Sequence, residues 1–156
     1  MPSSRRLSKM QQTMTTRDLV MEIKTIMVNF WLSINGVIYL ILGFMFIFQL
    51  ETIAANLNLL PQTGSASIEL VTVYGGLEAG LGILFIVALF VSKYRRFAIQ
   101  LLTFTYACFV AGRLAGLIGH EVTDNLTYYL LLFEVVGFAL SALLLLKSAD
   151  HSTARD

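Results

Sequence analysis

The sequence predicts an all-α integral membrane protein, a four-helix bundle with both termini on the same side of the bilayer. Of its 156 residues, 56% are hydrophobic and only 13% are charged, whereas an ordinary soluble domain carries about 25% charged residues. Four apolar runs are each long enough to cross a bilayer, and lysine and arginine are distributed very unevenly between them. These observations leave no length for a second domain.

The predicted spans form one domain, residues 26–146, which lies between a basic N-terminal segment, residues 1–25, and a polar C-terminal tail, residues 147–156. The four runs occupy residues 26–50, 68–91, 97–118 and 126–146. Each is about 30 Å long or more as a helix, which matches the hydrocarbon core. The N-terminal segment is predicted either as an amphipathic helix on an anionic membrane surface or as a partly disordered tail.

The linker between the first two spans is predicted to contain a short interfacial helix. Ile53, Leu57 and Leu60 recur at helical spacing, and Pro61 follows directly. Because proline cannot continue a helix, we expect the helix to end there and a turn to precede the second span.

The orientation in the membrane is predicted from the basic residues. Of the eleven lysines and arginines, every one except Arg113 lies in the N-terminal segment, the loop between the second and third spans, or the tail. The two connections on the other side contain none. The positive-inside rule therefore predicts cytoplasmic N- and C-termini for a multi-pass protein of the cell membrane.

Three charged residues lie well inside the predicted spans: Glu78, Arg113 and Glu134. A charged group at membrane depth is costly and is by default a ligand or proton site. The same residues can instead form a structural ion pair that holds the helices in register. Both interpretations stay open, and one arginine facing two glutamates leaves one carboxylate without a countercharge.

Glycines surround these charged residues. Small residues let membrane helices approach closely, and glycines spaced by four are a known packing pattern. The same small residues recur on the predicted faces of Glu78, Arg113 and Glu134. The glycines predicted to pack helices are Gly75, Gly76, Gly80, Gly82, Gly112 and Gly116.

Several functional classes lack support in this sequence. A net charge of +1 gives no electrostatic case for binding nucleic acid. Cys108 is the only cysteine, so the usual thiolate metal sites and intramolecular disulfides are excluded. We find no metal-ligand spacing, no nucleophile motif and no cofactor motif, so no catalytic residue, metal or cofactor is predicted.

Three motifs resemble an uncharacterised family of small bacterial four-helix membrane proteins, the domain of unknown function number 4345. They are residues 74–82 (YGGLEAGLG), residues 111–116 (AGRLAG) and the pair Phe133–Glu134. The resemblance covers roughly residues 26–146 and implies a fold and a bacterial inner membrane location, but no activity. More distantly, the chain is similar to DoxX-like membrane proteins, some of which are partners of redox enzymes or quinone-linked complexes.

Two hypotheses of function follow. In the first, Glu78, Arg113 and Glu134 bind a small amphipathic or quinone-like molecule between helices within the lipid bilayer. In the alternative, the protein is an accessory or scaffold subunit of a larger membrane complex, or a homo-oligomer, with no ligand of its own. An enzyme ranks third, because two carboxylates alone could supply acid–base chemistry but other catalytic signals are missing.

Overall fold

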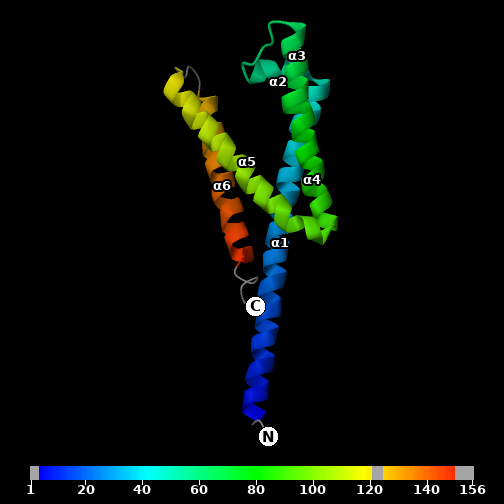
Figure 1. Cartoon of the computed structure of the whole chain (residues 1–156), viewed down its shortest axis with the longest axis vertical. Coiled ribbons are helices and arrows are strands. Elements are labelled where there is room, and N and C mark those ends of the chain that lie inside the picture. Colours follow the sequence, from blue (N-terminus) through cyan, green and yellow to red (C-terminus); the bar gives the residue numbers. More distant parts are fainter. Residues whose placement is uncertain (1–3, 121–124, 150–156) are drawn as a thin grey trace.

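The computed structural model describes residues 4–120 and 125–149, which form helices joined by short connections and contain no strand (Figure 1). The N-terminal residues 1–3, the acidic loop 121–124 and most of the predicted tail, residues 150–156, lie outside the described residues. The elements in order are α1 (Ser4–Phe48), α2 (Leu50–Asn56), α3 (Gly64–Leu70), η1 (Val71–Leu77), α4 (Glu78–Phe90), α5 (Ser92–Gly119) and α6 (Leu126–Ala149).

Four of the described helical segments are long and apolar enough to cross a membrane. α3, η1 and α4 run on without a break and together make the second span. The predicted all-α, four-helix membrane architecture is therefore confirmed. The four segments are Asp18–Phe48, Gly64–Phe90, Ser92–Gly119 and Leu126–Lys147.

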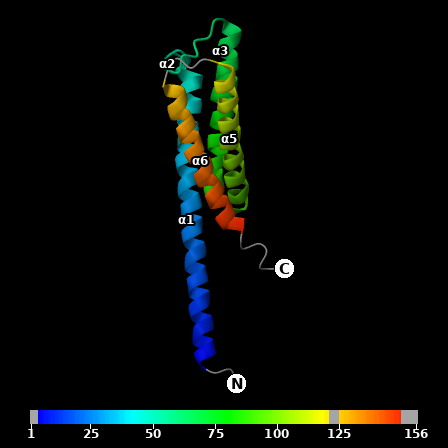
Figure 2. The ribbon, with the colours of Figure 1, turned by 90° about the vertical axis from the view of Figure 1, so that its left-hand side faces the viewer.

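The first helix is longer than the sequence analysis predicted. It begins at Ser4, so most of the N-terminal segment continues α1 instead of forming a separate surface element (Figures 1 and 2). Residues 4–25 contain neither glycine nor proline, and the apolar span that follows supplies a helix to extend, which is easier than starting a new one. The result is a single rod of 45 residues.

The predicted short helix of the linker is present as α2, but it ends at Asn56, before Leu57 and Leu60, and not at Pro61. The chain turns there, before the second span. Asn58, just after α2, has φ 54°, a left-handed conformation that asparagine adopts more readily than most residues. The side chain of Thr63 then accepts a hydrogen bond from the Ala66 amide, at 3.2 Å, and so begins α3.

The two ends of the molecule differ. α1 begins and α6 ends at the same end as the turn from α4 to α5 (Figures 1 and 2). We call this the basic end, because Lys24, Arg95, Arg96 and Lys147 gather there. The opposite end, which holds α2, α3 and the start of α6, we call the open end.

The hydrophobic core lies toward the basic end. Val28 and Leu32 of α1, Phe85 of α4, and Ala98 and Leu102 of α5 pack together there, each at most 5% exposed. α1 packs most extensively on α4 and η1, and α5 packs most extensively on α6. These two helix pairs are therefore joined mainly at the basic end.

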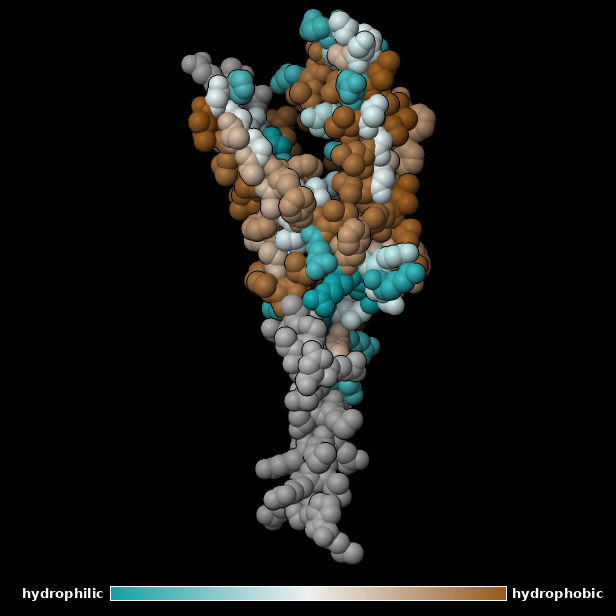
Figure 3. Space-filling view, in the orientation of Figure 1, coloured by the Kyte–Doolittle hydropathy of each residue, from teal (hydrophilic) through white to brown (hydrophobic). Residues whose placement is uncertain are grey.

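Toward the open end the two pairs diverge. We call them the α1/α4 arm (α3, η1, α4 and the α1 segment packed on them) and the α5/α6 arm. The space-filling view shows a cleft between the arms, largely lined by hydrophobic surface with a few hydrophilic atoms inside (Figure 3). This cleft is the feature that positions the candidate site.

Candidate intramembrane site

The candidate site begins with an ion pair between α5 and α6. The Arg113 guanidinium donates from Nε to Glu134 Oε2 at 2.8 Å and from Nη2 to Glu134 Oε1 at 2.6 Å. The Arg113 side chain is 26% exposed and that of Glu134 only 8%. A two-pronged, charge-assisted contact of this kind fixes the orientation of both side chains.

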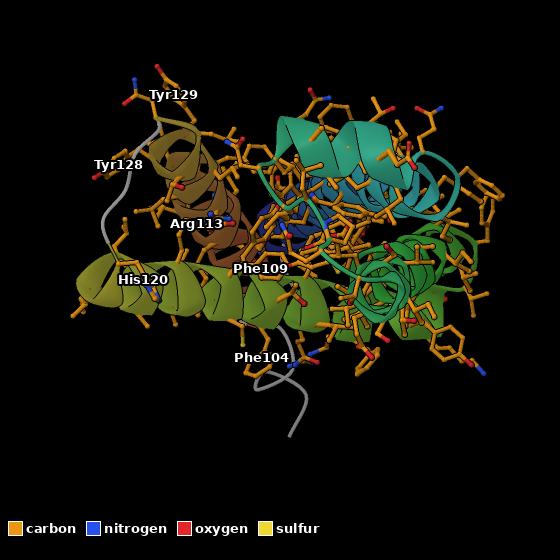
Figure 4. All side chains as sticks on the ribbon, turned by 90° about the horizontal axis from the view of Figure 1, so that it is seen from above. Phe104, Phe109, Arg113, His120, Tyr128 and Tyr129 are labelled. Carbon is orange, nitrogen blue, oxygen red and sulfur yellow. The ribbon has the colours of Figure 1, made fainter. Side chains whose placement is uncertain are left out.

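Arg113 reaches from α5 toward α6 when the molecule is viewed from the open end (Figure 4). Phe109, one helical turn before it, lies on the inner side of α5, whereas Phe104 points away from the other helices. Tyr128 and Tyr129 lie at the start of α6 and point outward. The side of α5 that carries Phe109 and Arg113 therefore faces the other helices.

Glu78 does not join the Arg113 pair. It is the first residue of α4, in the other arm, and among the described residues it forms no ion pair. Its Oε2 atom is buried and has no hydrogen-bond partner. The structure thus brings Arg113 and Glu134 together and leaves Glu78 apart, because α5 packs on α6 while α4 packs mainly on α1.

A chain of hydrogen bonds connects α5, α1 and α6 below the ion pair. The Tyr106 hydroxyl donates to Asn35 Oδ1 at 2.6 Å, and Asn35 Nδ2 donates to the Trp31 carbonyl oxygen at 2.8 Å. The Trp31 indole Nε1 donates to Ser141 Oγ at 2.8 Å. Buried polar groups need such partners, so this chain holds three helices in one register.

Tyr39 of α1 lies in the same buried region and meets the Phe85 ring of α4 edge-on, with ring centroids 5.6 Å apart. The Tyr39 hydroxyl is buried and has no hydrogen-bond partner. Tyr39 and Glu78 therefore each have unused hydrogen-bonding capacity at a buried atom.

Glu134, Gly137 and Ser141 follow one another at helical spacing on one face of α6, and all three are buried. A Cβ atom on Gly137 would lie 2.5 Å from Cζ of Tyr106, so the tyrosine ring fills the space above this glycine. Gly137 is thus required for the position of Tyr106.

Two of the glycines predicted to pack helices do so within the chain. A Cβ on Gly82 would lie 2.8 Å from the Leu40 backbone nitrogen, and one on Gly75 would lie 2.8 Å from Cγ1 of Ile47. Their partners on α1 are Gly36 and Gly43, where an added Cβ would meet α4 or η1 at 2.8 Å or less. Close contact between α1 and α4 rests on these four positions.

The other four predicted packing glycines lie on open helix surfaces. A Cβ on Gly80, Gly112 or Gly116 would meet nothing within 4 Å, and one on Gly76 would meet only the Val71 carbonyl oxygen, at 4.0 Å. They therefore make no helix contact within this chain. The reason is rotational: residues spaced by seven, Gly75 and Gly82, face α1, and this turns Gly76 and Gly80 away from it.

The π-helical segment η1 positions the opening of the cleft. π-helices are rare and occur mostly at functional sites. Tyr74 of η1 stacks on Phe46 of α1, with ring centroids 5.1 Å apart. No feature in the sequence predicted η1, although its Gly75–Gly76 pair marks a stretch where a regular helix is weak.

The described residues contain no group of three or more histidine, cysteine, aspartate or glutamate side chains that could hold a metal ion. Cys108 is free and exposed on α5. The chemistry that the site offers is hydrogen bonding and charge: a guanidinium, two carboxyl groups and three tyrosine hydroxyls in an apolar setting.

The comparison with protein families agrees with this architecture. A family model for a domain of unknown function, DUF4345, matches residues 9–145. No curated protein and no solved structure matches the chain. Since the matched region takes in all four spans and both halves of the candidate site, the chain belongs to the DUF4345 family.

Proposed function

We propose that this protein binds a small amphipathic or quinone-like molecule within the membrane, in the cleft between the α1/α4 arm and the α5/α6 arm. The observation that carries the proposal is the state of Arg113. Its Nε and Nη2 atoms donate to Glu134, Nη1 has no acceptor among the described residues, and the side chain is 26% exposed. A fixed arginine with donors to spare is suited to a carbonyl or anionic oxygen of a ligand.

The opposite side of the cleft offers a complementary group. Glu78, at the start of α4 in the other arm, has a buried oxygen without a partner. The apolar surface between Glu78 and Arg113 suits the hydrophobic part of a ligand, and ligand sites typically combine such a surface with a few converging polar groups (Figure 3). Glu78 and the Arg113–Glu134 pair then act as polar groups on two sides of one ligand.

The setting of the proposed site follows from the predicted orientation. With cytoplasmic termini in a bacterial inner membrane, the cleft opens in the half of the bilayer away from the cytoplasm. A molecule dissolved in lipid reaches it sideways between the arms. We favour a quinone-like ligand because the sequence motifs distantly resemble those of DoxX-like proteins, some of which are partners of quinone-linked complexes.

Native mass spectrometry of the protein purified from its own membrane tests the proposal. We expect the wild-type protein to retain a small molecule and the Arg113→Gln variant to lose it. The matched control is Lys93→Gln, which removes one exposed positive charge outside the cleft and keeps the ligand. Equal retention by Arg113→Gln and wild type contradicts the proposal.

A second variant separates ligand loss from unfolding. Arg113→Gln leaves Glu134 buried without its partner, which costs roughly 3–5 kcal/mol in buried pairs of soluble proteins. The double variant Arg113→Leu, Glu134→Leu removes both charges, and such replacements are often neutral or stabilising. We expect this variant to melt near the wild-type temperature and to be empty; a folded double variant that still carries the ligand contradicts the proposal.

The alternative function, an accessory or scaffold subunit, is favoured by a different observation. Gly76 and Gly80 on one arm and Gly112 and Gly116 on the other are free of contacts within the chain. Open glycines on a membrane helix allow close approach of another helix, either from a partner protein or from a second copy. The same mass spectra distinguish the alternatives, because a scaffold retains a protein mass that depends on these glycines and not on Arg113.

A further inference from the structure

A pocket of about 300 Å³ lies at the basic end, far from the cleft and outside the proposed function. Three helices form it: α1 near its entry into the membrane, the first turns of α5, and the last turn of α6. The described side chains that supply its charge are Lys24, Arg95, Arg96 and Lys147. These residues lie far apart in the sequence and meet only because the helices converge at this end.

The positive charge of this pocket is uncompensated among the described residues. No carboxylate lines the pocket, and the only ion pair that the structure describes is Arg113–Glu134. Lys24 Nζ donates to the Lys147 carbonyl oxygen at 2.9 Å, while Arg95 Nε is buried with no hydrogen-bond partner. Like charges held this close repel one another, so an anion placed among them is stabilised.

The pocket also has hydroxyl groups and apolar walls. Thr25 and Ser92 add hydroxyls beside the cations, and Val28 and Ile99, which belong to the hydrophobic core, form the wall toward the membrane. The space-filling view shows hydrophilic surface gathered at the lower edge of the hydrophobic region, at the start of α5 (Figure 3). The cations thus lie at the level where the lipid headgroups of one leaflet meet the apolar spans.

We propose that this pocket binds the phosphate of an anionic phospholipid, with Arg95, Arg96, Lys24 and Lys147 around the phosphate oxygens and the acyl chains along the apolar spans. Arginine and lysine are the residues that bind phosphate most strongly, arginine through paired donors. Basic pockets between membrane helices are a recurrent form of anionic headgroup site. The position at the membrane boundary favours a lipid over a soluble phosphate compound.

Lipid titration followed by native mass spectrometry tests the pocket in the full chain. We expect phosphatidylglycerol to bind the wild-type protein more tightly than phosphatidylcholine. In the Arg95→Gln, Arg96→Gln variant the affinity for phosphatidylglycerol falls by roughly tenfold or more, because each cation near an anionic headgroup contributes to binding. Lys93→Gln, one exposed charge outside the pocket, keeps the wild-type affinity.

Thermal unfolding gives a second measurement, because a ligand that binds only the folded state raises the melting temperature. We expect phosphatidylglycerol to raise the melting temperature of the wild type and of Lys93→Gln, and to raise that of Lys147→Gln less. Lys147→Gln is a single change at the end of α6, so it allows the measurement even if the double variant does not fold. Equal binding of the two lipids by wild type, or an unchanged effect in Lys147→Gln and the double variant, overturns the proposal. Tighter binding of inorganic phosphate than of phosphatidylglycerol overturns the assignment to a lipid and favours a soluble phosphate compound as the ligand.

Discussion

At the scale of single residues, the Tyr106 ring determines how the helices meet. Its hydroxyl donates to Asn35 of α1, and its ring rests on Gly137 of α6 and meets the Phe133 ring edge-on at 6.3 Å. A tyrosine in this position combines a large apolar contact with a directional hydrogen bond. Phe133 directly precedes Glu134 in α6, so the position of the Tyr106 ring affects the candidate site.

The first prediction concerns Gly137. In Gly137→Ala the new methyl group falls within 2.9 Å of three ring atoms of Tyr106, and the ring must move away from Asn35. We expect a loss of about 1–3 kcal/mol, as for other overpacked cores, measured by thermal unfolding in detergent. Gly116→Ala is the control, since an added Cβ there meets nothing within 4 Å; equal melting of the two variants contradicts the contact.

At the scale of elements, the contact between α1 and the η1–α4 segment depends on glycine backbone. An added Cβ on Gly43 would lie 2.6 Å from the Ala79 nitrogen, which is backbone and cannot rotate aside. Helices that approach this closely gain van der Waals contact over their whole shared length. The α5–α6 contact, in contrast, is fixed by side chains, namely the ion pair and the Tyr106 ring.

The second prediction compares two glycines of this pair of helices. Gly43→Ala forces α1 and α4 apart and is expected to cost roughly 2 kcal/mol or more, by analogy with overpacking elsewhere. Gly80→Ala fills open space and should be neutral, or more stable by up to about 1 kcal/mol because alanine is the better helix former. Melting curves of the two variants in one detergent decide the matter, and a greater loss in Gly80→Ala shows that its face is buried against another molecule.

The sequence predicted which segments form spans but not which faces they turn toward one another. Apolar length identifies a membrane helix, yet every side of such a helix is apolar, so periodicity does not select the packed face. The four-residue spacing of Gly76 and Gly80 drew attention to the open side of α4, while Gly36 and Gly43 went unassigned. The rotation of each helix is set by its neighbour and is therefore tertiary information.

The candidate site shows the same limit. The sequence singled out Glu78, Arg113 and Glu134 because charge inside an apolar run is rare. It could not choose between the two glutamates as the partner of Arg113, since that depends on α5 packing beside α6. Likewise, Trp31 donates a hydrogen bond to Ser141 inside the bundle, a contact that becomes visible only once the two helices are packed together.

At the scale of the whole molecule, the four spans bring the start of α1, the α4–α5 turn and the end of α6 to one end (Figures 1 and 2). All the described lysine and arginine side chains except Arg113 belong to these parts of the chain. The α2–α3 connection lies at the open end and contains no lysine or arginine. The whole stretch from Thr25 to Ser92 contains none either. The charge difference between the two ends is the basis of the predicted orientation.

The third prediction places the basic end in the cytoplasm. A reporter that is active only in the cytoplasm, fused at the C-terminus, should be active, and the same reporter inserted near Gly64 should be silent, because lysine and arginine favour the cytoplasmic side. A reporter that is active only outside should give the opposite pattern. If the reporter that is active only outside gives a signal when it is fused at the C-terminus, the predicted orientation is wrong.

The divergence of the two arms has a mechanical consequence. The arms are joined through the core at the basic end and diverge toward the open end. A small rotation of one arm at the core therefore produces a larger displacement toward the open end. A change of about 5° at the joint, carried over two to three helical turns of about 5.4 Å each, moves the residues that line the cleft by roughly 1 Å. The distance between Tyr74 and Arg113 therefore depends on side-chain packing in the core, two to three helical turns away. A single methyl group added in the core changes the width of the cleft.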